Sequence, residues 1–126
     1  MKRILSFVLI ASFTYTNAAT TTSASNKKLV KSFCYAMQSS NQCKNINMRL
    51  DTEQEVEKIV GSPVRGPQSQ YNSDCLDGTT AAIKDGDKAC DKAIANYGCS
   101  GKKIQGLIQD NPFNNKNGSF CKFNGL

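Results

Sequence analysis

Apolar side chains recur three and four residues apart in the first half of the chain, and turn-forming residues interrupt this pattern. Between residues 27 and 38 the apolar positions form one stripe, so a helix is predicted there with Asn26 as its N-cap. The stripe consists of Leu29, Val30, Phe33, Cys34 and Met37. The polar residues at 39–41 are expected to end this helix.

A second helix has the clearest start signal in the chain. Thr52 and Glu55 have the spacing of a capping box, in which each side chain accepts a hydrogen bond from the backbone N–H of the other residue. Gly61 is placed to end this helix in the left-handed conformation. The expected buried face consists of Val56, Ile59 and Val60.

The middle of the chain predicts short, interrupted elements. Pro67 is expected to open a short helix that carries Tyr71 and Cys75 four residues apart on one face. The Asp-Gly pair at 77–78 is expected to break that helix, and a short apolar run at 81–83 follows it.

Two further helices are predicted toward the C-terminus. The first has an apolar stripe closed by Gly98, and the second is capped by Ser100. Their buried faces are Ala89, Cys90, Ala93, Ile94 and Tyr97 in the first, and Ile104, Leu107 and Ile108 in the second. Because no run of four or more β-branched or aromatic residues alternates with polar ones, the chain is predicted to be all-α, a small bundle of four to five short helices.

The N-terminal region predicts export. Residues 1–18 have the order of a secretory signal: basic residues, a short apolar run and small residues at a cleavage site after Ala18. The apolar run is roughly half of the ~20 residues that a membrane-spanning helix needs, so we expect no membrane-spanning segment. Residues 19–26 are expected to be a disordered tail, and 27–126 one domain. We therefore expect the protein to be secreted: it would be extracellular, or periplasmic if the source is a Gram-negative bacterium.

The cysteines predict that this domain is cross-linked by three disulfides. An even count in a short exported chain is typical of a disulfide framework, although six cysteines allow fifteen pairings. A Cys90–Cys99 bond is disfavoured because a helix would separate the two residues, whereas Cys34–Cys43 stays open. The six residues are Cys34, Cys43, Cys75, Cys90, Cys99 and Cys121. With no His and no Cys-x-x-Cys pair, we expect no zinc site and no cofactor.

One acidic segment gives a calcium site as an alternative. Residues 85–91 resemble part of the Asp-rich loop of the extracellular calcium-binding region called Excalibur, which ends in a similar Ala-Cys-acid sequence. The resemblance implies Asp85, Asp87 and Asp91 as ligands. The segment departs from that pattern, because Ile83 replaces an expected Asp and Lys88 replaces a glycine.

The residue types argue against an enzyme. Absence of His removes nucleophile pairs that depend on an imidazole. A hydrolase with two carboxylates remains formally open, with Glu53, Glu55 and Glu57 as candidates. These three are expected to face solvent, which does not raise a carboxyl pKa as a catalytic acid requires.

Charge and exposed aromatic residues suggest the kind of partner. The net charge of +6 falls to +4 when Lys2 and Arg3 are removed with the signal. The basic residues, such as Lys27-Lys28 and Lys102-Lys103, are scattered as isolated pairs, so we expect no nucleic-acid binding. Weak attraction to an anionic surface is expected. Candidate contact residues are Tyr71, Phe113 and Phe120, and Asn117 lies in a glycosylation sequon.

These features favour a small secreted monomer that binds an extracellular protein or surface without catalysis, as an effector, toxin or inhibitor does. The first alternative is a carrier of a small apolar ligand or lipid in a helical cavity. Insect odorant-binding proteins and oomycete elicitins are carriers of this architectural class, but their cysteine spacing differs from that of this chain. The second alternative is the carboxylate-based hydrolase.

Overall fold

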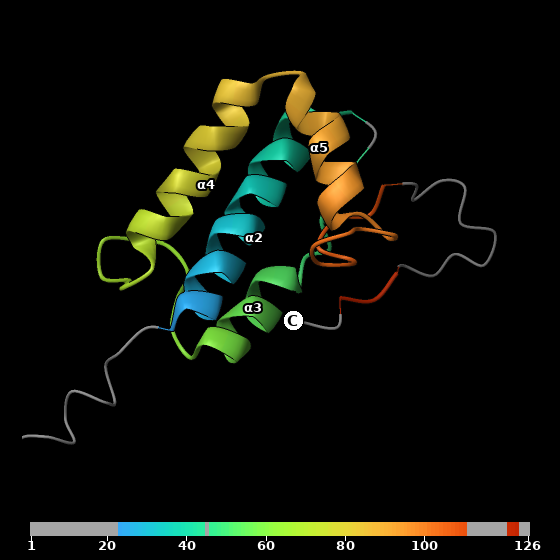
Figure 1. Ribbon diagram of the computed structural model, residues 1–126. Coiled ribbons are helices and arrows are strands. Elements are labelled where there is room, and N and C mark those ends of the chain that lie inside the picture. The colour runs from blue at the N-terminus through green and yellow to red at the C-terminus, as the bar shows by residue number, and fades with distance from the viewer. Residues whose placement is uncertain (1–22, 45, 111–120, 124–126) are drawn as a thin grey trace, which may run out of the picture.

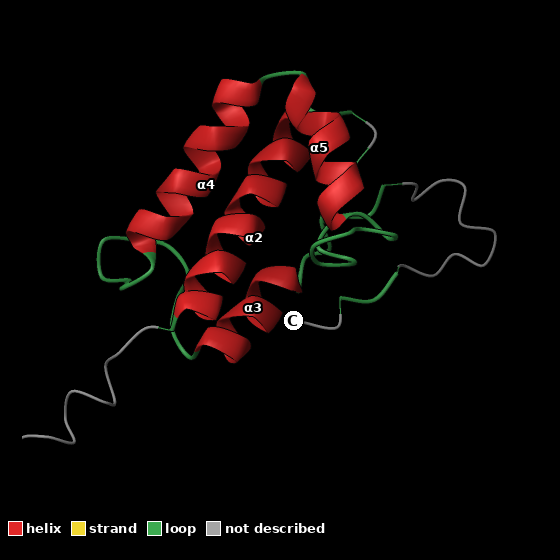
Figure 2. Ribbon diagram, in the orientation of Figure 1, coloured by secondary structure: helices red, strands yellow, loops and turns green. Residues whose placement is uncertain are grey.

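Four α-helices form the described part of the protein, as the all-α prediction requires (Figure 2). The structure is a computed structural model that describes residues 23–44, 46–110 and 121–123. The signal at 1–18 and the first part of the predicted tail lie outside these ranges. Within them, the β-type pairing is limited to one bridge between Asn47 and Gln109. The helices are α2 (Ala24–Gln42), α3 (Thr52–Val60), α4 (Asn72–Asp85) and α5 (Lys88–Tyr97).

Helix α2 is the centre of the bundle. Figure 1 shows α4 on one side of it, α5 on the other, and α3 beside its N-terminal half. The helix begins at Ala24, within the segment expected to be a tail, because the Ser23 hydroxyl accepts a hydrogen bond from the N–H of Asn26 at 3.1 Å. It also continues past 38, since Ser39 and Ser40 donate their hydroxyls to carbonyls of the preceding turn instead of ending the helix.

The predicted start of α3 is wrong in its details. Asp51 occupies the N-cap position without a side-chain capping bond, and Thr52 is buried within the first turn. Gly61 ends the helix with φ of 73°, as predicted. Val56 and Val60 are buried, whereas Ile59 is 43% exposed. The helix therefore depends on a narrower apolar contact than its sequence suggests.

Helix α4 runs through the glycine that was expected to break it. A Cβ atom at Gly78 would overlap the carbonyl oxygen of Lys31 and lie 3.0 Å from the backbone nitrogen of Tyr35. The missing side chain lets α4 lie directly against the backbone of α2. That contact outweighs the usual cost of glycine in a helix, about 1 kcal/mol relative to alanine.

Helix α5 forms with its predicted apolar face turned to the core, but the helix predicted after Ser100 does not form. Residues 101–110 fold back onto the end of α5, and their backbone N–H groups bind carbonyls that the helix leaves unpaired. Lys102, Lys103 and Ile108 donate to Ala95, Asn96 and Tyr97, respectively, each at 3.0 Å. The apolar residues of this segment are buried, as predicted: Ile104, Leu107 and Ile108.

Three disulfides join segments that are far apart in the sequence. Cys34–Cys75 links α2 to α4, Cys43–Cys90 links the end of α2 to α5, and Cys99–Cys121 links the segment after α5 to the C-terminal residues. The predicted cross-linking of helices is confirmed. Neither Cys90–Cys99, which was disfavoured, nor Cys34–Cys43, which was left open, is formed.

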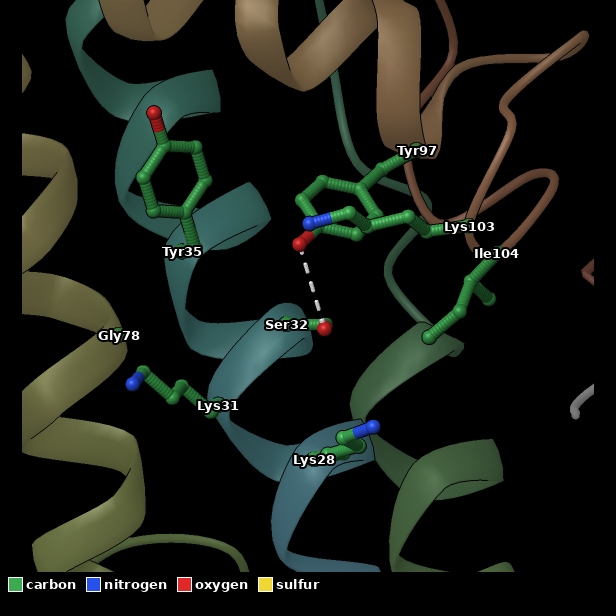
Figure 3. A pocket seen from close by; sticks show the side chains of 8 residues that line it. All are labelled: Lys28, Lys31, Ser32, Tyr35, Gly78, Tyr97, Lys103 and Ile104. Atoms are coloured by element: carbon green, nitrogen blue, oxygen red, sulfur yellow. Dashed lines mark hydrogen bonds between the residues drawn. The ribbon is translucent and has the colours of Figure 1, made fainter. Parts of the chain in front are cut away.

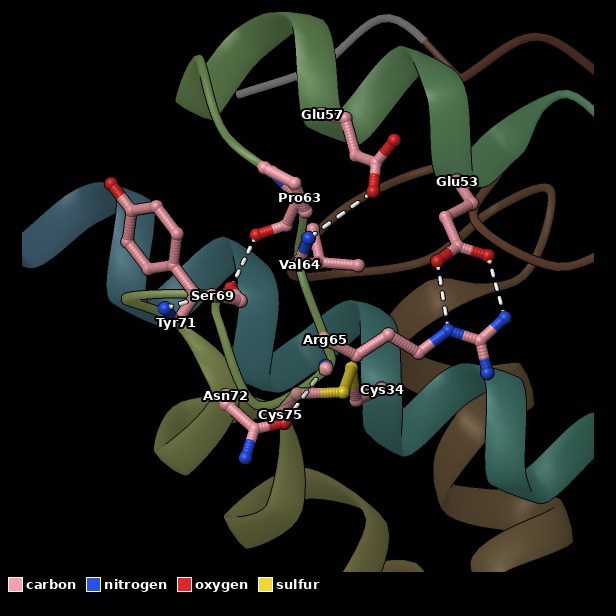
Figure 4. Close-up of a disulfide and its surroundings, with 11 residues drawn as sticks. Cys34, Glu53, Glu57, Pro63, Val64, Arg65, Ser69, Tyr71, Asn72 and Cys75 are labelled. Atoms are coloured by element: carbon pink, nitrogen blue, oxygen red, sulfur yellow. Dashed lines mark hydrogen bonds and ion pairs between the residues drawn. A yellow bond between two sulfur atoms is a disulfide. The ribbon is translucent and has the colours of Figure 1, made fainter.

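The connector between α3 and α4 packs beside the Cys34–Cys75 bond (Figure 4). Glu57 accepts a hydrogen bond from the N–H of the buried Val64 at 3.2 Å. Glu53 binds the Arg65 guanidinium through both carboxylate oxygens, at 2.8 and 2.9 Å. These contacts hold the connector against α3 and so set where α4 begins.

Candidate functional site

A cleft lies over α2, between α4 and the end of α5 (Figure 3). Its volume is about 550 Å³, within the range of roughly 300–1,000 Å³ that is typical of small-molecule sites. Helix α2 provides its floor, α4 one wall, and the end of α5 with the segment after it the other wall. The lining residues are Lys28, Lys31, Ser32, Tyr35, Gly78, Tyr97, Lys103 and Ile104.

Hydrogen bonds beside the cleft hold α2, α4 and α5 together. The Tyr35 hydroxyl donates to Asp85 at 2.6 Å, and Lys92 of α5 donates to the same carboxylate oxygen at 3.2 Å. The hydrogen bond from Tyr35, and then that from Lys92, lowers the pKa of Asp85. Burial, followed by the bond to Asp85, raises the pKa of Tyr35. The phenol therefore stays protonated and its hydroxyl is committed to Asp85.

The inner surface of the cleft is mainly aromatic and aliphatic. The rings of Tyr35 and Tyr97 meet edge to face, with centroids 6.1 Å apart and planes at 60°. The Tyr97 hydroxyl donates to Ser32 at 3.2 Å (Figure 3). Because Gly78 has no side chain, the α4 wall at this point lies directly against the backbone of α2. Ile104, 6% exposed, completes the apolar surface.

Three lysines surround this apolar surface at the mouth of the cleft. Lys28 and Lys31 come from successive turns of α2, and Lys103 comes from the segment that folds back on α5 (Figure 3). All three are exposed and form no ion pair with any residue that the structure describes. No carboxylate is among the lining residues of the cleft. Three cations around one opening produce a local positive potential that attracts anions.

This site was not predicted from the sequence. Lys27-Lys28 and Lys102-Lys103 are isolated pairs along the chain, whereas the fold brings Lys28 and Lys103 to the same cleft. One signal was available, because residues 28, 31, 32 and 35 share one face of a helix at spacings of three and four. That face carries lysines, a hydroxyl and a tyrosine beside the apolar stripe.

The contact residues proposed from the sequence are not brought together in the described structure. Tyr71 is only 1% exposed and its hydroxyl accepts a hydrogen bond from the Asn26 amide at 3.2 Å, so its proposed role as an exposed contact is wrong. Phe113, Asn117 and Phe120 lie outside the described residues.

The acidic segment at 85–91 has other contacts. The Asp85 carboxylate accepts hydrogen bonds from Tyr35 and Lys92, while Asp87 and Asp91 are exposed. Across residues 23–44, 46–110 and 121–123, no group of three or more His, Cys, Asp or Glu residues is arranged to hold a metal ion.

The carboxylates of α3 are each engaged separately. Glu53 binds Arg65, Glu55 lies 3.5 Å from the Lys58 ammonium, and Glu57 binds the Val64 N–H. They stabilise the connector and the helix surface.

No protein-family model matches the chain, and neither curated proteins nor solved structures include a significant match. The described helices include none that is long and apolar enough to cross a membrane.

Proposed function

We propose that this is a non-catalytic binding protein that acts outside the cell and holds an anionic group of its partner in the cleft between α4 and α5. The observation that carries the proposal is the gathering of Lys28, Lys31 and Lys103 around one opening, with no carboxylate in the lining. Secretion is supported by three disulfides, which persist in oxidising compartments, together with the signal-like N-terminus.

Unpaired lysines favour binding of an external anion over a structural role. Lys92 is paired with Asp85, whereas no described carboxylate pairs with the cleft lysines, so their charges are available to an external anion. The three cleft lysines are exposed and line one preformed depression. Their separate origins in α2 and in residues 101–110 mean that the bundle must be folded, and cross-linked, to present them together.

The side chains that line the cleft support a non-catalytic role. Its side chains offer ammonium groups, hydroxyls and apolar surface, and Tyr35 is held protonated by burial and by Asp85. None of these lining groups is a carboxylate or imidazole that would take up a proton near neutral pH.

The carrier hypothesis is a second candidate, favoured by the aromatic floor of the same cleft. A carrier of a neutral apolar ligand would use the rings of Tyr35 and Tyr97 and would not need the lysines. The cleft differs from the enclosed cavity expected for such a carrier, because exposed lysines form its mouth.

The proposal is tested by NMR titration of the oxidised ¹⁵N-labelled domain with three anionic probes: tetraglutamate, dextran sulfate and decanoate. We expect at least one probe to shift the amide signals of the cleft residues. The variant K28Q/K31Q/K103Q should lose these shifts, while K44Q/K84Q/K88Q, which removes the same charge from exposed positions outside the cleft lining, should keep them. If no probe shifts cleft signals, or if both variants behave alike, the proposed function is wrong.

A further inference from the structure

We infer that the ligand of the cleft is a small amphipathic anion: an apolar chain or ring that ends in a single carboxylate or sulfate, as in a fatty acid. The inference rests on the proposed binding function and adds the chemical class of the ligand. It follows from the layered arrangement of the cleft, with apolar surface inside and ammonium groups at the mouth.

The inner part of the cleft can bind apolar groups because its polar atoms already have partners. The Tyr35 hydroxyl donates to Asp85, and the Tyr97 hydroxyl donates to Ser32. What these tyrosines offer to a ligand is therefore mainly ring surface. With Ile104 and the backbone at Gly78, these rings form an apolar surface on which a slender apolar group can lie.

The mouth supplies the opposite chemistry. Lys28 and Lys31 lie about one turn apart on α2, and Lys103 extends over the Tyr97 ring from the segment after α5 (Figure 3). The distance along α2 from Lys28 to Tyr35 is about 10 Å, at 1.5 Å per residue. A ligand with its apolar end near Tyr35 would thus place a terminal anionic group among the lysines. A purely hydrophilic anion would leave the aromatic surface uncovered.

A network of hydrogen bonds joins the helices beside Tyr35. Asp85 binds both Tyr35 and Lys92, and Gln42 donates to the carbonyls of Ala82 and Gly86 at 3.2 and 3.3 Å. These contacts join the helices at the end where α4 passes into α5. The network fixes the Tyr35 ring in place, so the apolar surface that it offers to a ligand is preformed.

Isothermal titration calorimetry of the oxidised domain with decanoate tests the inference. We expect one binding site, and replacing decanoate by octanoate should weaken binding about tenfold, since two methylene groups leave the apolar surface. K28Q/K31Q/K103Q should weaken decanoate binding by about tenfold, and K44Q/K84Q/K88Q should leave it nearly unchanged. Decyltrimethylammonium, which has the same chain and a positive head, should not bind.

A second variant tests the apolar part separately. Ser32→Leu places an aliphatic side chain on the floor and reduces the volume available to a chain, so decanoate binding should fall about tenfold or more. Circular dichroism and thermal unfolding show whether the variant keeps the fold. If Ser32→Leu does not fold, the comparison of octanoate with decanoate still decides the question.

The outcomes separate this inference from the proposed function. One outcome is that tetraglutamate or dextran sulfate binds at the cleft, that K28Q/K31Q/K103Q loses this binding, and that fatty acids show no dependence on chain length. This outcome would overturn the amphipathic ligand but leave the anion-binding function standing. Equal binding of decanoate and decyltrimethylammonium would also overturn the inference, because the lysines would then play no part. Failure of every anion to bind would overturn both.

Discussion

The side-chain amide of Gln109 pairs with the backbone of Cys121 as a neighbouring strand would. Its oxygen accepts the Cys121 N–H at 2.8 Å, and its nitrogen donates to the Cys121 carbonyl at 3.1 Å. The backbone of Gln109 forms a second reciprocal pair with Asn47, at 2.7 and 3.0 Å. This buried residue thus holds both the connector after α2 and the C-terminal segment.

Replacing Gln109 by Leu should destabilise the oxidised protein by about 1–3 kcal/mol, because both backbone groups of Cys121 lose their partner in a buried site. Urea unfolding with the disulfides intact measures this change. Gln105→Leu, at an exposed position of the same segment, is the matched control and should have little effect. Equal stability of the two variants would show that the paired amide contributes nothing.

Gly78→Ala should destabilise the protein by about 1–3 kcal/mol, although alanine is ordinarily the better helix former. The added methyl group would overlap the Lys31 carbonyl and push α4 away from α2. Thr80→Ala, at an exposed position of α4, should be neutral or stabilising. Thermal unfolding of both variants makes the comparison, and a more stable Gly78→Ala would contradict the close approach of the two helices.

Asp85 should make stability depend on pH in the acid range. Its pKa is lowered in the folded protein, chiefly by the Tyr35 hydrogen bond and then by Lys92, so its contribution is present above its ordinary value of 3.8. The contribution is lost as the pH falls through the lower folded pKa. Urea unfolding between about pH 2 and pH 6 should show a smaller acid loss for Asp85→Asn than for the wild type. Asp87→Asn is the control at an exposed carboxylate and should follow the wild-type curve.

Peptide mapping of the non-reduced protein should recover the pairs Cys34–Cys75, Cys43–Cys90 and Cys99–Cys121. The double variant C34A/C75A should lose about 3–4 kcal/mol, as expected for a loop of 41 residues closed by one bond. The Cys99–Cys121 bond closes a loop of 22 residues, so C99A/C121A should lose slightly less. Recovery of a Cys90–Cys99 peptide would contradict the helix that ends at Tyr97.

Some features of the fold follow from the sequence because they depend on neighbours in the chain. The stripes at Leu29–Phe33 and Ala89–Tyr97 place apolar groups on one side of a helix, and that local periodicity is enough to predict both helices. Gly61 ends α3 for an equally local reason, since glycine adopts positive φ without a Cβ penalty. The expectation of disulfides similarly needed only the cysteine count and the signal-like N-terminus.

The tertiary structure decided what depends on distant residues. Gly78 continues a helix because α2 lies against it, and residues 101–110 are not helical because the end of α5 offers them unpaired carbonyls. The choice among fifteen cysteine pairings required the helices to be placed in space. The cleft has the same origin: Lys28 and Lys103 share a mouth only because the chain folds back after α5. Local pattern determines helices, whereas contacts between segments far apart in the chain determine how they pack and where a site forms.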